Sequence, residues 1–216
     1  MTCTVIIDGS EIKTTCNSNL LQTALDNGIY IPNLCYIKNN ERQFASCRLC
    51  FVEIDGKPEP VTACTEHVVD GMVIRVNSPR AVALRRTAFE LLLSNHQLEC
   101  GRCPKNRRCE LQQIARFNHL KLRSPVLTRI NESKPVDDSH PHFRFNPNKC
   151  VLCGRCVVVC HKEGTGVLDF AHRGIRARVS TFMDIPLAET ECNSCLACVD
   201  VCPVGALYRK IMEIKV

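Results

Sequence analysis

Short apolar runs and turn residues alternate through the first 77 residues, and this pattern predicts a small sheet with one helix. Apolar and polar positions alternate over 4–8 and 11–15 around Asp8-Gly9-Ser10, which predicts a β-hairpin. Ser18 or Asn19 can cap a helix that reaches Asp26, with Gly28 at its C-cap. Further strands are expected at 51–55, 61–64 and 72–76. This order predicts a β-grasp domain over residues 1–77.

Helical periodicity begins after Ser78-Pro79, a cap residue followed by proline at the first helical position. The expected helix runs into His96, and a second, short helix is expected near Glu110. The predicted apolar stripe of the first helix consists of Val82, Leu84, Ala88, Phe89, Leu92 and Leu93. The two helices predict a small helical domain over residues 78–121.

The segment 122–148 is rich in Pro, Asp, Asn and Ser and has no clear period, which predicts a linker. We expect His140 and His142 in this segment to be solvated. Residues 149–216 then form the last predicted domain. Within it, "VLDFAHRGIRARVSTF" predicts an inserted hairpin that turns near Arg173-Gly174.

Cysteine is abundant, with 17 thiols in 216 residues, while the aromatic content is only 5% and tryptophan is missing. Cores this small need a metal or covalent staple. The N-terminus lacks the basic and long apolar regions of an export signal, and no apolar run approaches the ~20 residues of a membrane span. We therefore expect a cytoplasmic protein without a membrane span, whose reduced thiols serve metal or redox chemistry.

The cysteines of the first domain are spaced Cys35-x11-Cys47-x2-Cys50-x13-Cys64. One tight pair with a distant partner on each side has the form of a plant-type [2Fe–2S] site, whereas zinc ribbons show two tight pairs. We predict one [2Fe–2S] cluster held by these four residues.

The last domain contains the bacterial ferredoxin spacing twice, as Cys150-x2-Cys153-x2-Cys156-x3-Cys160 and Cys192-x2-Cys195-x2-Cys198-x3-Cys202. Each run gives three ligands to one [4Fe–4S] cluster and its fourth to the other. One cluster is therefore expected on Cys150, Cys153, Cys156 and Cys202. The second is expected on Cys160, Cys192, Cys195 and Cys198.

Between these lies His96-x3-Cys100-x2-Cys103-x5-Cys109, which fits either zinc or a [4Fe–4S] cluster. Three predicted iron–sulfur sites in the same chain favour the cluster. An imidazole ligand is neutral where thiolate is anionic, so it should raise the reduction potential. Four quartets use fifteen of the seventeen cysteines, and we expect Cys3 and Cys16 to be buried core thiols.

The formal charge of +6 matches buried anionic clusters better than a nucleic-acid surface. By formal counting the four clusters bring about −7. Arg48, Arg102 and Arg155 lie beside predicted ligands, as this compensation requires. The sequence offers no phosphate-binding loop, no dinucleotide motif and no catalytic triad, so no catalytic residue is assigned. A zinc-stabilised nucleic-acid-binding protein is the competing hypothesis from another class.

Four stretches carry a family resemblance: "ASCRLCFVEIDG", "VTACTEHVVDGMVIRV", "NHQLECGRCPKNRRCELQ" and the double ferredoxin run. The chain resembles the N-terminal iron–sulfur region of the large peripheral subunit of respiratory complex I and the corresponding regions of NAD-linked hydrogenases and formate dehydrogenases. The resemblance implies an α+β chain with a β-grasp [2Fe–2S] domain, a helical His/Cys3 [4Fe–4S] domain and a two-[4Fe–4S] ferredoxin-like domain.

Because nothing follows "CPVGALYRKIMEIKV", the chain looks most like the electron-transfer subunit of multi-subunit NAD-coupled [NiFe] hydrogenases, including electron-bifurcating ones. This implies an oxidoreductase subunit that converts no substrate itself. It would relay single electrons within a hetero-oligomer, between a flavin/NAD(H)-binding subunit and hydrogenase subunits. The alternative is the same role in an NAD-dependent formate dehydrogenase or a complex I-like enzyme.

Overall fold

The computed structural model describes residues 1–40, 42–122, 133–163 and 165–210. The chain divides into two compact units. Unit 1 consists of Met1–Leu91 and Arg116–Leu120, and unit 2 of Leu92–Ala115 and Lys121–Val216. Helix α2 (Pro79–Asn95) and helix α3 (Glu110–Phe117) each contribute residues to both units. The four-segment division predicted from sequence stays a prediction.

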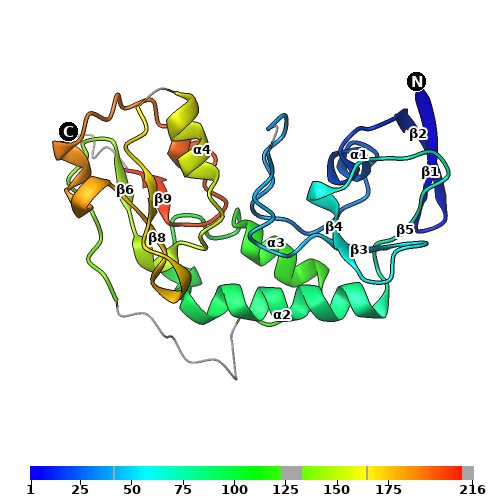
Figure 1. The fold of residues 1–216 in the computed structure, drawn as a ribbon. Helices are drawn as coiled ribbons and strands as arrows, with labels where there is room; N and C mark the ends of the chain where they lie inside the picture. Colours follow the sequence, from blue (N-terminus) through cyan, green and yellow to red (C-terminus); the bar gives the residue numbers. More distant parts are fainter. Residues whose placement is uncertain (41, 123–132, 164, 211–216) are drawn as a thin grey trace, which may run out of the picture. The chain divides into compact units, whose positions relative to one another are not determined.

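Unit 1 is built on a sheet with the strand order β2-β1-β5-β3-β4 in the described residues (Figure 1). Its strands are β1 (Thr2–Ile7), β2 (Ser10–Thr15), β3 (Phe51–Ile54), β4 (Val61–Thr62) and β5 (Val73–Arg75). Strands β1 and β2 pair in antiparallel register, with Val5 opposite Ile12, which confirms the predicted hairpin. Strand β1 pairs in parallel with β5, so the first and last strands are neighbours, as in a β-grasp fold.

Helix α1 (Leu20–Asp26) begins where the sequence predicts. The Asn19 side chain accepts a hydrogen bond from the backbone N–H of Gln22, and Gly28 follows the helix with a φ of 75°. The helix buries Leu20, Leu21 and Ala24 in the same core as the sheet residues Val5, Ile7, Val52 and Ile74. The apolar faces of the sheet and the helix therefore form one core, which surrounds Cys50 and Cys64.

The strand predicted over 61–64 ends at Thr62, because the chain then enters a 3₁₀-helix, η1 (Ala63–Thr65). The Thr65 hydroxyl donates to the backbone oxygen of Thr62 and closes this turn. The turn carries Cys64, which the sequence analysis placed on a strand.

Helix α2 confirms the predicted cap, since the Ser78 hydroxyl accepts from the backbone N–H of Ala81. The predicted stripe is wrong at Leu84, which is 39% exposed. The buried positions in this part of the helix are Ala81, Arg85, Ala88 and Phe89, which share a face at spacings of three and four residues. An arginine therefore occupies the core position that the sequence analysis gave to leucine.

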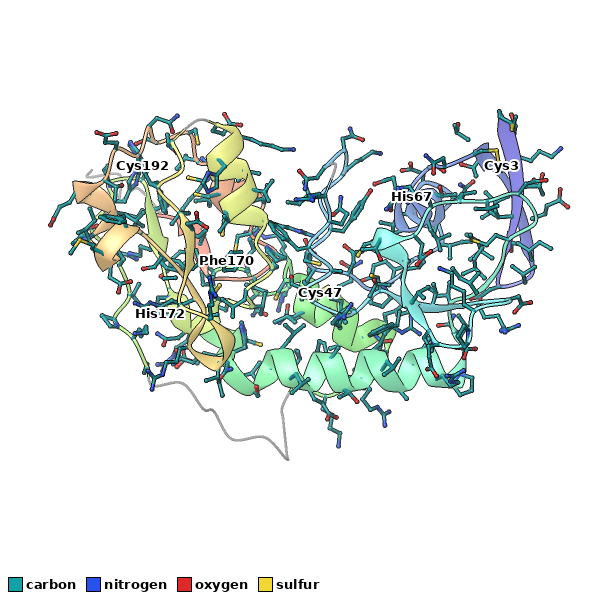
Figure 2. The ribbon with its side chains drawn as sticks, viewed as in Figure 1. Cys3, Cys47, His67, Phe170, His172 and Cys192 are labelled. Carbon is teal, nitrogen blue, oxygen red and sulfur yellow. A yellow bond between two sulfur atoms is a disulfide. The ribbon has the colours of Figure 1, made fainter. Side chains whose placement is uncertain are left out.

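Cys3 and Cys16 form a disulfide, with their Cα atoms 5.1 Å apart, instead of two separate core thiols (Figure 2). The hairpin register places Cys3 opposite Thr14, so Cys16 follows just beyond the paired residues. Disulfides are uncommon in reducing compartments, and the cytoplasmic localisation stays a prediction.

The disulfide joins residues that are 13 positions apart in the sequence. Replacing both Cys3 and Cys16 with serine should lower the free energy of unfolding by about 3 kcal/mol, because the disulfide closes a loop of this length in the unfolded chain. Urea unfolding, with and without a thiol reductant, tests this. Reduced wild-type protein should match the double variant. A wild-type curve that the reductant leaves unchanged would contradict the pairing.

Unit 2 contains two small two-stranded sheets in its described residues. Strand β6 (Phe143–Phe145) pairs antiparallel with β9 (Leu207–Arg209), and β7 (Asp169–Ala171) with β8 (Arg178–Ser180). The second pair confirms the inserted hairpin. Helix α4 (Arg155–Lys162) carries Cys156 and Cys160 of the first ferredoxin run, and α5 (Ala197–Asp200) carries Cys198 of the second. The 3₁₀-helices in the described residues of unit 2 are η2 (Cys100–Arg102), η3 (Pro147–Lys149), η4 (Gly174–Arg176), η5 (Phe182–Asp184) and η6 (Leu187–Glu189).

Two predictions for the segment 122–148 need correction, although its residues 123–132 lie outside the described part. Phe143–Phe145 is a strand, not linker, because it pairs with β9. His140 is only 3% exposed, and its ring lies 4.1 Å from that of Phe143. Burial lowers the pKa of His140, and its Nε2 lies 3.2 Å from the Ser194 hydroxyl. His142 is exposed, as expected.

The sheets and helices together confirm the α+β class. No helix in the described residues is long and apolar enough to cross a membrane.

Candidate metal centres

The four cysteines of unit 1 lie together in its core. The exposed fractions of Cys35, Cys47, Cys50 and Cys64 are 1%, 3%, 1% and 1%. The Sγ atoms of Cys35 and Cys47 are 3.5 Å apart. Figure 2 marks Cys47 among the side chains of this unit. Four thiols from three separate loops thus converge where no water reaches them.

These thiols share protons, which shows how closely they lie. The Cys47 thiol, followed by that of Cys64, donates to Cys35 and lowers the pKa of Cys35 to about 2. The Cys64 thiol likewise lowers the pKa of Cys50, while donating raises the pKa values of Cys47 and Cys64. Two sulfurs therefore readily become thiolates, and bound iron would take the place of the shared protons.

Local backbone geometry explains how the tight pair can reach one centre. Arg48, between Cys47 and Cys50, has a φ of 55°, so the chain reverses within the motif. The buried Leu49 anchors this loop to the core. The backbone oxygen of Cys50 accepts from the N–H of Ala63, which holds the Cys64 turn beside the pair. A left-handed residue beside right-handed neighbours turns successive N–H groups to one side, an arrangement that binds anions and iron–sulfur sites.

The two ferredoxin runs of unit 2 repeat the same backbone turns. In both, the residues immediately before and after the second cysteine have positive φ. These are Leu152 (53°) and Gly154 (78°) in the first run, and Ser194 (58°) and Leu196 (62°) in the second. Leucine adopts this conformation at a cost, which indicates that the loop requires it. In the first run, the N–H of Leu152 lies 3.4 Å from the Cys150 sulfur and points toward it.

The structure brings the eight cysteines together in the crossed arrangement that the spacing predicts. One small cavity is lined by Cys150, Cys153, Cys156 and Cys202, and a second by Cys160, Cys192, Cys195 and Cys198. Each cavity contains three cysteines from one run and the last cysteine of the other. The donor set and the cavities fit two [4Fe–4S] clusters, and this ligand assignment is a proposal.

Burial is the main influence on several of these thiols. It raises the pKa values of Cys150, Cys153 and Cys198 to about 12, and it raises the pKa of Cys156 well above its ordinary value. Mutual repulsion among thiolates adds to the rise. Without metal these sulfurs keep their protons, so binding of iron must release them.

His96 follows α2 and is positioned by its backbone and its ring. Its backbone N–H donates to the oxygen of Leu93, and its Nδ1 lies 3.0 Å from the backbone oxygen of Lys149. A hydrogen bond from Nδ1 to a carbonyl is the usual way to orient a metal-binding imidazole and to make Nε2 the ligand atom. We therefore assign Nε2 as the ligand nitrogen of the proposed His/Cys3 site.

The cysteines of this quartet lie on η2 and the loop before α3. Burial raises the pKa of Cys109, and the thiolates of Cys103 and Cys100 raise it further, so these three sulfurs are neighbours. Gly205 packs against Cys103, since a Cβ atom at Gly205 would lie 2.5 Å from the Cys103 sulfur.

Further contacts join the His96 quartet to the Cys150 site within unit 2. Lys149, which contacts His96, directly precedes Cys150. The backbone N–H of Glu110, next to Cys109, donates to the oxygen of Pro203, next to Cys202. The Glu110 carboxylate also pairs with Arg155 at 2.7 Å. Sequence reasoning missed Lys149 and Gly205, because both act through backbone positions that carry no side-chain signal.

A single-ion site is not supported in the described residues. No group of three or more His, Cys, Asp or Glu side chains there is arranged to hold one metal ion.

Family models match three consecutive parts of the chain. Residues 1–79 match a 2Fe-2S iron-sulfur cluster binding domain, and residues 85–121 match the NADH-ubiquinone oxidoreductase-G iron-sulfur binding region. Residues 149–206 match a 4Fe-4S dicluster domain. A crystal structure of NAD+-reducing [NiFe]-hydrogenase is similar over 99% of this chain and 90% of that chain, with a TM-score of 0.87 and 30% identity. The chain belongs to the iron–sulfur subunit family of NAD(P)-linked hydrogenases and complex I.

Curated members of this family differ in length. NADP-reducing hydrogenase subunit HndD of Solidesulfovibrio fructosivorans is 37% identical over 95% of this chain and 36% of its own length. For the mitochondrial 78 kDa subunit of NADH-ubiquinone oxidoreductase from Neurospora crassa the identity is 32%, over 94% of this chain and 27% of its own length. The γ subunit of NAD-reducing hydrogenase HoxS of Cupriavidus necator is 29% identical, over 97% of this chain and 88% of its own length. The chain thus spans about a third or less of the first two relatives.

If His96 ligates iron, His96→Cys should retain a four-iron cluster with a lowered reduction potential, because an anionic thiolate replaces a neutral imidazole. His96→Ala should lose or degrade that cluster. Redox titration followed by electron paramagnetic resonance measures both. The exposed His142, replaced by alanine, is the matched control. Spectra unchanged in both His96 variants would show that His96 is not a ligand.

Proposed function

We propose that this chain is the iron–sulfur electron-relay subunit of a multi-subunit NAD-linked hydrogenase. It would hold one [2Fe–2S] and three [4Fe–4S] clusters on the quartets described above. When bound, the clusters supply one-electron redox chemistry, which the side chains of this chain cannot provide. Residues 1–77, 78–121 and 149–216 would be the three cluster domains.

The contact between His96 and Lys149 carries this proposal. Through it, a ligand of one proposed cluster is hydrogen-bonded to the residue that precedes a ligand of the next. Gly205 and Glu110 make further contacts between the same two sites. The chain's own residues would thereby hold the two proposed redox sites side by side within unit 2, as a relay requires.

The match along almost the full length of hydrogenase subunits supports a hydrogenase partner. The γ subunit of HoxS and the NAD+-reducing [NiFe]-hydrogenase chain are covered to 88% and 90%. We infer that a flavin/NAD(H)-binding subunit and hydrogenase subunits are the partners, in a cytoplasmic hetero-oligomer. Hydride transfer and hydrogen activation would take place in those partners.

Metal analysis tests the cofactors directly. Anaerobically isolated protein should be brown and contain about 14 iron atoms and as many labile sulfides. A colourless protein with about four zinc atoms would overturn the relay and favour the nucleic-acid alternative.

The relay itself is tested by comparing the isolated chain with the native complex. Dithionite should reduce the clusters of the isolated chain, whereas NADH alone should not, because the sequence offers no dinucleotide-binding motif. In the native complex, both NADH and hydrogen should reduce them. Direct reduction of the isolated chain by NADH would contradict the assignment, and reduction of the complex by formate instead of hydrogen would favour the formate dehydrogenase alternative.

A further inference from the structure

Arg85 is a charged residue that is buried within unit 1. It lies on α2 and is 1% exposed, which makes it the largest of the fully buried side chains in the described residues. Ala81, one turn before it, and Phe89, one turn after it, are buried on the same face. Arginine stays protonated in proteins, so the fold places a permanent positive charge at this buried position.

The guanidinium of Arg85 has fewer hydrogen-bond acceptors around it than it has N–H donors. Its Nη2 donates to Asn77 Oδ1 at 3.3 Å, but Nε and Nη1 are buried and have no acceptor. Asp8 is the carboxylate whose charge acts on Arg85, but its oxygens already accept from the N–H of Val76 and the side chain of Asn77. Burying such a charge without a full set of partners is costly.

The other negative group that acts on Arg85 is the thiolate of Cys50. Burial lowers the pKa of Arg85, while Asp8 and Cys50 raise it again. In the described residues, Arg155 Nε is the other buried side-chain nitrogen without an acceptor. Arg155 in turn interacts with the Cys153 thiolate. Both incompletely satisfied arginines therefore lie in the field of a proposed cluster ligand.

We propose that Arg85 is the buried counter-cation of the [2Fe–2S] site and holds the reduction potential of that cluster up. This inference rests on the proposed function, because it requires the cluster. Four thiolates and the inorganic core bring net negative charge into a space where water cannot screen it. Arg85 donates to Asn77, which follows Val76, and Val76 lies in the same core as Cys50 and Cys64. A fixed cation buried at this place stabilises the negative charge of the cluster, and stabilises it more after the cluster has gained one further electron.

Arg48 shows why position along the chain does not reveal this role. It directly follows Cys47, but it is exposed, and its guanidinium carbon lies 5.9 Å from the centre of the Phe51 ring. Water screens an exposed charge, so its effect on the cluster should be small. Arg85 is 35 positions after Cys50, yet it is the buried one of these two arginines.

The test uses the full chain with its clusters assembled anaerobically and compares Arg85→Met with Arg85→Lys. The matched controls are Arg80→Met and Arg86→Met, each of which removes an exposed cation from the same helix. Redox titration with electron paramagnetic resonance measures the [2Fe–2S] potential, and the [4Fe–4S] signals of the same samples are an internal reference. Arg85→Met should shift the [2Fe–2S] potential downward. Arg85→Lys should keep the potential close to that of the wild type, and the control variants should change it little. The [4Fe–4S] potentials should stay unchanged.

A [2Fe–2S] potential that moves no further in Arg85→Met than in the controls would overturn the proposal. An equal shift in Arg85→Met and Arg85→Lys would do the same, because it would show a packing effect. If Arg85→Met fails to assemble the cluster, iron content decides: retention in Arg85→Lys supports the counter-cation, and loss in both variants refutes it. Absence of the [2Fe–2S] signal from wild-type protein would instead refute the proposed function.

Discussion

Replacing Cys202 with alanine should cost the protein about four iron atoms from the site of the first ferredoxin run, far away in sequence. Cys202 lines one cavity with Cys150, Cys153 and Cys156. Burial raises the pKa of Cys153, and negative charge on Cys150 and Cys202 adds to the rise. Removing one of four ligands exposes an iron atom to exchange. The cluster on Cys192, Cys195 and Cys198 should persist, although these residues are the sequence neighbours of Cys202.

Iron and sulfide analysis with electron paramagnetic resonance measures which cluster is lost. Cys160→Ala is the reciprocal variant, because Cys160 lines the other cavity with the second run. It should damage the Cys192 site and spare the Cys150 site. Loss of the Cys192 site in Cys202→Ala would show that each run ligates its own cluster, and the crossed assignment would be wrong.

Gly205→Ala should disrupt the proposed His/Cys3 cluster. The added Cβ would lie 2.5 Å from the Cys103 sulfur, closer than any ordinary contact. A protonated cysteine could turn away, but a sulfur bound to iron is held by the cluster, so the conflict is largest in the loaded protein. Iron content should fall by about four atoms, or the potential of this cluster should change, while the [2Fe–2S] signal remains.

Gly101→Ala is the matched control for this experiment. Gly101 follows Cys100 in the same ligand loop, has no positive φ, and a Cβ there would meet nothing within 4 Å. This variant should assemble all clusters. Equal iron content and equal potentials in Gly205→Ala and the wild type would show that the Cys103 sulfur is not fixed beside Gly205.

Sequence signals predicted those turns and helix starts that depend on hydrogen bonds and backbone preferences of neighbouring residues. Asp8-Gly9 specifies the turn between β1 and β2, and Asn19 and Ser78 specify helix starts through their side chains. The β7–β8 hairpin was predicted in the same way. Each of these features depends on residues a few positions apart, so the sequence shows them directly.

Predictions failed where packing between segments far apart in the chain decides which residues are buried or paired. Leu84 lies off the buried face of α2, and Arg85 lies on it, because packing against residues distant in the chain selects the buried face of the helix. Phe143–Phe145 became a strand through pairing with Leu207–Arg209, and His140 is buried beside this strand. Cys3 and Cys16 are joined because the hairpin register brings them together.

By itself, the sequence determined the spacing from which the four ligand quartets are predicted, since few residues separate the ligands of one cluster. This spacing also led to the iron–sulfur hypothesis. Only the tertiary structure decided which sites are neighbours and which charges surround them. The His96–Lys149 hydrogen bond, the approach of Gly205 to Cys103 and the burial of Arg85 all join residues far apart in the chain. Contacts of this kind depend on three-dimensional packing, which no spacing along the chain encodes.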